Sequence, residues 1–276
     1  MGRSLVLFAA TLAALLALTG FQATSETAAT RLLGRLFGAL IEIDRWLPVH
    51  QDDLQAVAAD ATRDQISLPD FALPVGVSRE AVAAWDYEAL RSEILADAGL
   101  QLYRDGRDAF GAEGAVAGDL ALDEPARWAI DLLGEGMHGF WTAALVVTAG
   151  VSGLLLALAA ISTGRAGRRS LLSPIIVGAG VFVVGTLIAR VVLGMLGGSA
   201  SSPVDEEVAR LAEDAAWIGT RAGFATALLA LVLVALAYLL GEGRAGDPWP
   251  SVLDEASPDE QPVFDTEAPR SPVQRS

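Results

Sequence analysis

Four long apolar segments constrain the fold of this chain more than any other feature. They cover residues 4–21, 139–161, 171–196 and 218–240. An α-helix rises about 1.5 Å per residue, so about 20 apolar residues match a hydrocarbon core about 30 Å thick. The last three segments are long enough to span a bilayer. The sequence therefore predicts an all-α polytopic membrane protein with four transmembrane helices.

The first apolar segment has two interpretations. A basic residue, Arg3, before a short apolar core is typical of a secretory signal peptide as well as of a membrane anchor. The residues that follow offer poor cleavage sites, which favours an uncleaved first transmembrane helix over residues 1–21. Either interpretation sends residue 22 and its successors to the same side of the membrane.

Arginine placement predicts the orientation of the chain. Arg165, Arg168 and Arg169 lie in the loop 162–170, and no acidic residue occurs from 136 to 204, although the whole chain has a net charge of −15. Short arginine-rich loops stay on the cytoplasmic side of a membrane. We therefore interpret these three arginines as determinants of membrane topology. With four crossings, both termini of this multi-pass protein are expected in the cytoplasm, and the membrane is expected to be the plasma membrane.

Residues 22–138 must then lie outside, where we expect a helical extracytoplasmic domain. They carry 21 acidic residues and nine arginines, a surplus of negative charge that repels nucleic acid. Apolar spacing and capping residues predict the elements of this domain. These are helices over 25–47, 51–64, 78–105 and 124–141, with an extended connector over 66–76, a stop at Pro48 and a bend at Gly134 and Gly136.

Two further segments outside the spans are predicted from composition. Residues 197–217 form an acidic hairpin between the third and fourth spans, on the same side as the extracytoplasmic domain. Residues 241–276 carry six of the twelve prolines and few large apolar residues, which is typical of a disordered acidic tail in the cytoplasm.

The charges near the outer ends of the third and fourth spans form the candidate site. Arg190 and Arg221 are predicted at the outer interface, where long arginine side chains reach the headgroup region. Asp205, Glu206 and Glu207 of the acidic hairpin are candidate partners for them. Structural anchoring and a ligand or ion site both remain open as roles for this cluster.

No catalytic, cofactor-binding or metal-binding residue is predicted. Residues 150–153, GVSG, resemble the nucleophile sequence of rhomboid intramembrane proteases. That chemistry needs a histidine base beside Ser152, and the chain has only His50 and His138. His138 lies 14 residues earlier in the same predicted helix, or about 21 Å away, so the resemblance stops at the nucleophile. The chain has no cysteine, and its histidines lack the spacing of zinc ligands.

Small and aromatic residues give expectations about packing. Within the spans, small residues let helices approach closely, and those at suitable spacing are Ala149, Gly153, Gly178, Gly180 and Gly185. The pair Gly34 and Gly38 lies outside the spans, where this spacing carries little weight. We expect Trp141 and Trp217 at the membrane interface. We expect Trp46, Trp85 and Trp128 in the core of the extracytoplasmic domain.

These observations favour a non-enzymatic membrane protein whose outer domain binds a protein partner or an envelope component. The alternative is a transporter or channel subunit that forms oligomers through its last three spans. The lipid bilayer is the one partner implied directly, and a homo-oligomer or a membrane-protein partner is possible. All 19 basic residues are arginines, and the chain contains no asparagine. This amino-acid usage indicates a GC-rich bacterial gene.

Overall fold

The computed structural model is mostly helical. It describes residues 2–60, 64–68, 71–110, 123–162, 173–200 and 202–242. The chain divides into two compact units, Met1–Val234 and Ala235–Ser276. The topology arginines Arg165, Arg168 and Arg169, and the predicted tail beyond residue 242, lie outside the described residues.

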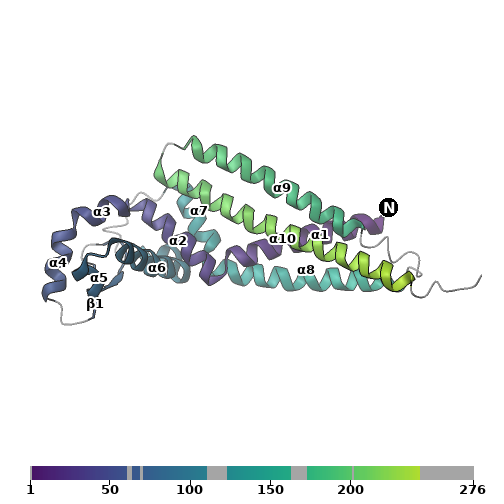
Figure 1. Cartoon of the computed structure of the whole chain (residues 1–276), viewed down its shortest axis with the longest axis horizontal. Coiled ribbons are helices and arrows are strands. Elements are labelled where there is room, and N and C mark those ends of the chain that lie inside the picture. The colour runs from purple at the N-terminus through teal and green to yellow at the C-terminus, as the bar shows by residue number, and fades with distance from the viewer. Residues whose placement is uncertain are drawn as a thin grey trace, which may run out of the picture. The chain divides into compact units, whose positions relative to one another are not determined.

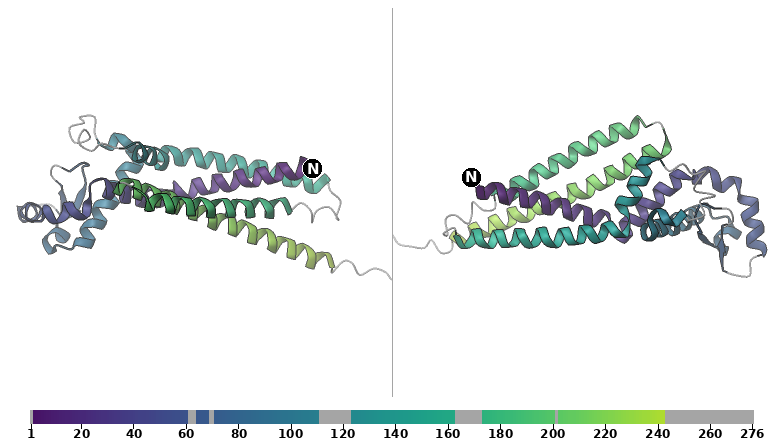
Figure 2. Two further views of the ribbon diagram at one scale, coloured as in Figure 1. Left: turned by 90° about the horizontal axis from the view of Figure 1, so that it is seen from above. Right: turned by 180° about the vertical axis from the view of Figure 1, so that it is seen from behind.

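Four long helices run side by side in the views of Figures 1 and 2. They are α1 (Gly2–Ala23), α8 (Glu135–Ser162), α9 (Ser173–Gly198) and α10 (Pro203–Glu242). Each contains a segment that is long and apolar enough to cross a membrane. The prediction of four helices that are long and apolar enough to span a membrane is confirmed.

Helix α1 packs against each of the other three long helices. Gly20 lies against the ring of Trp141 in α8. A Cβ atom at Gly178 of α9 would come within 3.2 Å of Thr11, and one at Gly219 of α10 would come within 3.2 Å of Thr19. These contacts place α1 among the other three helices rather than beside them.

Small residues allow close approach at only some of the predicted positions. Gly178 is packed as expected, but a Cβ built at Gly153, Gly180 or Gly185 would have no described atom within 4 Å beyond its own helical backbone. Helices α9 and α10 pack closely instead at Gly223, where an added Cβ would lie 2.6 Å from Cγ2 of Val183. The glycines that permit packing were therefore only partly identifiable from spacing.

The segment between α1 and α8 folds into a separate helical layer, which we call the inserted domain. It contains α2 (Glu26–Leu40), α3 (Ile43–Val49), α4 (Gln51–Asp60), β1 (Gln65–Ser67), β2 (Gly76–Ser78), α5 (Arg79–Ala84), α6 (Tyr87–Asp105), the 3₁₀-helix η1 (Gly106–Phe110) and α7 (Glu124–Leu133). In Figure 1 these elements gather at the end of the long helices that is opposite the N-terminus.

Two predicted helices are interrupted by residues in the left-handed backbone region. Glu42, with φ 48°, separates α2 from α3, and Trp85, with φ 47°, separates α5 from α6. This conformation costs a non-glycine residue about 1–2 kcal/mol. At Glu42 the change of direction is compensated by burial, because Ile43 and Leu47 of α3 become almost completely shielded from solvent. Sequence periodicity does not report such breaks.

Other boundaries of the inserted domain agree more closely with the prediction. Ser78 caps α5 by accepting a hydrogen bond from the Ala81 N–H, and Gly106, with φ +59°, ends α6. Gly134 separates α7 from α8. The predicted connector 66–76 forms short strands at its two ends, because β1 and β2 pair antiparallel with Ile66 opposite Val77.

The core of the inserted domain forms where α2 crosses α6. A Cβ atom at Gly34 would collide with the carbonyl oxygen of Leu95, and one at Gly99 would collide with that of Thr30. The expectation that Gly34 matters little for packing is therefore wrong, because this glycine permits the close helix crossing. Fully buried side chains line both helices at this crossing, namely Leu33, Leu36, Phe37, Leu90, Ile94 and Leu102.

Tryptophan placement agrees only in part with expectation. Trp46 and Trp85 are partly buried and pack against the core of the inserted domain. Trp128 on α7 is 60% exposed, so the prediction that it belongs to the core is wrong. Its neighbours Ala126 and Ala129 face inward instead.

The first turns of α10 complete the core of the inserted domain. Leu211 is buried in it, and Val204 and Val208 pack against it. The spacing of these three residues follows one face of a helix. The segment predicted as an acidic hairpin over 197–217 is thus mainly helix, continuous with the fourth apolar segment.

Candidate functional site

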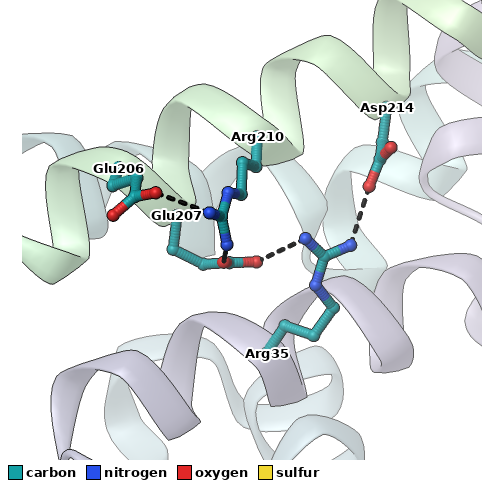
Figure 3. Close-up of polar contacts among 5 residues, drawn as sticks. All are labelled: Arg35, Glu206, Glu207, Arg210 and Asp214. Carbon is teal, nitrogen blue, oxygen red and sulfur yellow. Dashed lines mark hydrogen bonds and ion pairs between the residues drawn. The ribbon is translucent and has the colours of Figure 1, made fainter. Parts of the chain in front are cut away.

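Arg35 links the inserted domain to α10. Its Nη2 atom lies 2.7 Å from Oε1 of Glu207, and its Nη1 atom donates a hydrogen bond of 2.7 Å to Oδ2 of Asp214. Glu207 and Asp214 are seven residues apart, which is two turns of one helix and the same face. Figure 3 shows the Arg35 side chain reaching from α2 toward both carboxylates.

Two more residues of α10 extend these contacts into a network. The Nη2 atom of Arg210 lies 2.5 Å from Oε1 of Glu206, and its Nη1 atom lies 3.8 Å from Oε2 of Glu207. Arg35, Glu206, Glu207, Arg210 and Asp214 are called the interhelical network below (Figure 3). Its members on α10 alternate along the helix with Val204, Val208 and Leu211, which pack against the core of the inserted domain.

Glu207 is the most shielded charge of the interhelical network. Its side chain is only 11% exposed. Its Oε1 atom is buried and accepts no hydrogen bond from the described residues, even though it forms the ion pair with Arg35. The angles of that contact are not those of a hydrogen bond, so charge attraction holds the pair. A shielded carboxylate is costly without its cation.

A second group of charges lies farther along α10. The Nε atom of Arg190 donates a hydrogen bond of 2.8 Å to Oε1 of Glu213. The guanidinium carbons of Arg190 and Arg221 each lie 4.9 Å from the centroid of the Trp217 ring. Arg190, Glu213, Trp217 and Arg221 are called the arginine–tryptophan cluster below.

The residues of the predicted charge cluster are thus divided between two groups. Arg190 and Arg221 meet at Trp217, whereas Glu206 and Glu207 belong to the interhelical network. Asp205 forms no ion pair with a described residue, and its backbone N–H donates to the Ser202 hydroxyl at the start of α10. Sequence reasoning missed Arg35, because it is one of several charges between apolar positions of α2. The helical spacing of Val204, Val208 and Leu211 is the sequence pattern that could have indicated an apolar face of α10 docked on the inserted domain.

Two pockets of the inserted domain adjoin Arg35 and Arg91. One, of about 680 Å³, is lined by both of these arginines together with Arg31 and Leu95. The other, of about 550 Å³, lies between the α2–α3 turn and the start of α10. Thr30 also lines the larger pocket, and its buried hydroxyl has no hydrogen-bond partner among the described residues.

Asp44 fixes the position of Arg91 between these pockets. Its Oδ1 atom accepts hydrogen bonds of 2.7 Å from Nε of Arg91 and from the Tyr87 hydroxyl. The Arg91 hydrogen bond, followed by that of Tyr87, holds the pKa of Asp44 below its usual value. The same carboxylate raises the pKa of Tyr87 and of Arg91.

The two histidines make separate contacts. His138 places Nδ1 3.2 Å from the Thr24 hydroxyl, and His50 places Nδ1 2.9 Å from the carbonyl oxygen of Trp46. Neither contact involves Ser152. Within the part of the chain that the structure describes, no three His, Asp or Glu side chains are grouped as metal ligands.

No protein-family model, curated protein or solved structure matches the chain significantly.

Proposed function

We propose that this protein is a non-enzymatic integral protein of the plasma membrane whose inserted domain binds a partner or an envelope component. The arginine loop 162–170 faces the cytoplasm and the inserted domain lies outside. The observation that carries the proposal is the pair of pockets that share Arg35 and Arg91. Their volumes, about 680 and 550 Å³, fall in the range of small-molecule and peptide-anchor sites.

The lining of the larger pocket indicates the chemistry of its ligand. Arg31 is exposed there and forms no ion pair with a described residue, whereas Arg35 and Arg91 are already paired. Leu95 and Leu100 supply an apolar wall. Glu26 and Glu88 also line the pocket, so its three arginines leave a net charge of +1. This lining favours a ligand that carries an acidic group beside an apolar part, with Arg31 as its main ionic contact.

Arg35 gives ligand binding a route to the membrane helices. It lines both pockets and also pairs with Glu207 and Asp214 of α10. Helix α10 continues from these carboxylates into the fourth apolar segment without interruption. A ligand that moves Arg35 therefore acts on α10 directly, which suits a protein that reports an external binding event.

Site-specific photocrosslinking in cells tests this proposal. A photoreactive amino acid at Ala96, an exposed residue that lines the larger pocket, is expected to give an adduct of discrete mass in the full-length protein. The adduct should disappear when Arg31→Glu is introduced. The same photoreactive residue at Ala56, exposed on α4 and away from both pockets, is the matched control. Identical adducts at the two positions, or none at Ala96, would contradict the proposal.

The alternative, a transporter or channel subunit, uses Arg190 and Arg221 as an external anion gate. It predicts ion or solute flux in proteoliposomes that changes when both arginines are replaced by leucine. In the structure Arg190 bonds Glu213, and both arginines contact Trp217. These contacts favour another role for the pair.

A further inference from the structure

The arginine–tryptophan cluster lies at one edge of the apolar layer. After Arg221, α10 continues for the 19 uncharged residues 222–240, which is about 28 Å of helix. Helix α9 places the 17 uncharged residues 173–189, about 26 Å, before Arg190. Both lengths approach the thickness of a hydrocarbon core, so both arginines reach the same headgroup region.

Aromatic residues mark the same level. Trp217 of α10 contacts both arginines, and Trp141 of α8 packs on Gly20 of α1. Gly219, two residues after Trp217, packs on Thr19, the neighbour of Gly20. Tryptophan side chains are enriched where acyl chains meet headgroups. The two tryptophans and two arginines therefore belong to one interfacial band, on the side of the inserted domain.

The cluster has more positive than negative charge. Glu213 accepts one hydrogen bond from Arg190, at Nε, and the terminal nitrogens of Arg190 have no acidic partner among the described residues. Arg221 is exposed and forms no ion pair with a described residue. An arginine at a membrane boundary is stabilised by an anionic partner, and Arg221 has none among the described residues.

The two arginines share one aromatic ring. Both guanidinium carbons lie 4.9 Å from the same ring centroid, so they are no farther apart than twice that distance. A guanidinium presents a planar set of donors that matches two phosphate oxygens, and the terminal nitrogens of both arginines are available for it. The Trp217 ring holds both cations through cation–π contact and offers an apolar surface to the adjoining acyl chain.

We propose that Arg190, Trp217 and Arg221 bind the phosphodiester headgroup of an anionic phospholipid in the leaflet next to the inserted domain. The net positive charge selects a lipid whose phosphate is not compensated by an ammonium group. Glu213 holds Arg190 in position and leaves its terminal nitrogens for the lipid.

Native mass spectrometry of the full-length protein in detergent tests the site. The protein is titrated with dioleoyl phosphatidylglycerol or with dioleoyl phosphatidylcholine, and the fraction that carries lipid gives an apparent Kd. We expect phosphatidylglycerol to bind roughly tenfold more tightly than phosphatidylcholine, and Arg221→Gln to remove that difference. Arg127→Gln, the same change at an exposed arginine of α7, should leave both affinities as in the wild type.

Three results would overturn the proposal. They are equal affinity for the two lipids in the wild type, an unchanged lipid preference in Arg221→Gln, and displacement of the lipid by millimolar inorganic phosphate, which would indicate a free-anion site. If Arg221→Gln does not fold, Arg221→Lys replaces it. Lysine keeps the charge but loses the bidentate contact, so the preference for phosphatidylglycerol over phosphatidylcholine should fall by roughly threefold.

Discussion

Arg35 shows how a single side chain joins two parts of a membrane protein. It lies on α2 of the inserted domain and contacts two carboxylates of α10, of which Glu207 is nearly buried. Ion pairs on open surfaces contribute little to stability. This pair differs because removing Arg35 would leave a shielded carboxylate without a cation.

Replacing Arg35 by glutamine tests that difference. We expect Arg35→Gln to lower the free energy of unfolding by about 1–3 kcal/mol, the range for an orphaned polar group in a protein interior. Arg45→Gln is the control, because Arg45 and Glu42 are 3.4 Å apart and mostly exposed, with side chains 83% and 55% accessible. Thermal unfolding of the full-length protein in detergent measures both variants. Equal shifts would show that Glu207 is stabilised by something other than Arg35.

Asp44 gives the inserted domain an acid-dependent stability. Its folded-state pKa is lowered by the hydrogen bonds from Arg91 and Tyr87. Because the pKa is lowered, Asp44 stabilises the folded protein fully at pH values above its unfolded-state pKa. This stabilisation is lost as the pH falls through its folded-state pKa. Because Asp44 is 65% exposed, the contribution is expected to be below about 1 kcal/mol.

The measurement compares the wild type with Asp44→Asn. Unfolding curves between pH 6 and pH 3 should show a smaller loss of stability in the variant, because asparagine does not titrate. The variant should already be slightly less stable at pH 6. A parallel loss in both proteins throughout this range would exclude Asp44 as a source of the acid dependence.

At the scale of elements, the sequence predicted what depends on local composition. Apolar length alone predicted the four long helices, and Ser78 and Gly106 correctly marked the ends of helices. The breaks at Glu42 and Trp85 were missed because these residues adopt a backbone conformation that tertiary burial compensates. The local sequence alone does not indicate this compensation.

The crossing of α2 and α6 depends on two glycines that have no room for a side chain. Gly99→Ala is expected to destabilise the protein by about 1–3 kcal/mol, because the new methyl group would meet rigid backbone at Thr30 and Gly34. Gly136→Ala is the matched control, since no described atom lies within 4 Å of its added Cβ. Its helical position should make alanine neutral or slightly stabilising. Unfolding of both variants in detergent measures the contrast.

At the scale of the whole molecule, the candidate site was predictable only in part. The sequence placed Arg190 and Arg221 near the end of their spans, and the structure joins them at Trp217. It did not predict that Glu207 would pair with Arg35, which lies 172 positions earlier in the chain. Such pairing depends on how α10 docks on the inserted domain, and a pattern along one helix does not contain that information.

Orientation in the membrane is the prediction on which the proposed function depends, and the absence of cysteine makes it directly measurable. Single cysteines at Ser92, exposed in the inserted domain, and at Gly167, in the arginine loop, have no native background. Because short arginine-rich loops remain in the cytoplasm, a membrane-impermeant maleimide should label Ser92→Cys in intact cells. Gly167→Cys should react only after permeabilisation. Replacing Arg165, Arg168 and Arg169 with glutamine should weaken this difference, whereas the reverse labelling pattern would place the inserted domain in the cytoplasm.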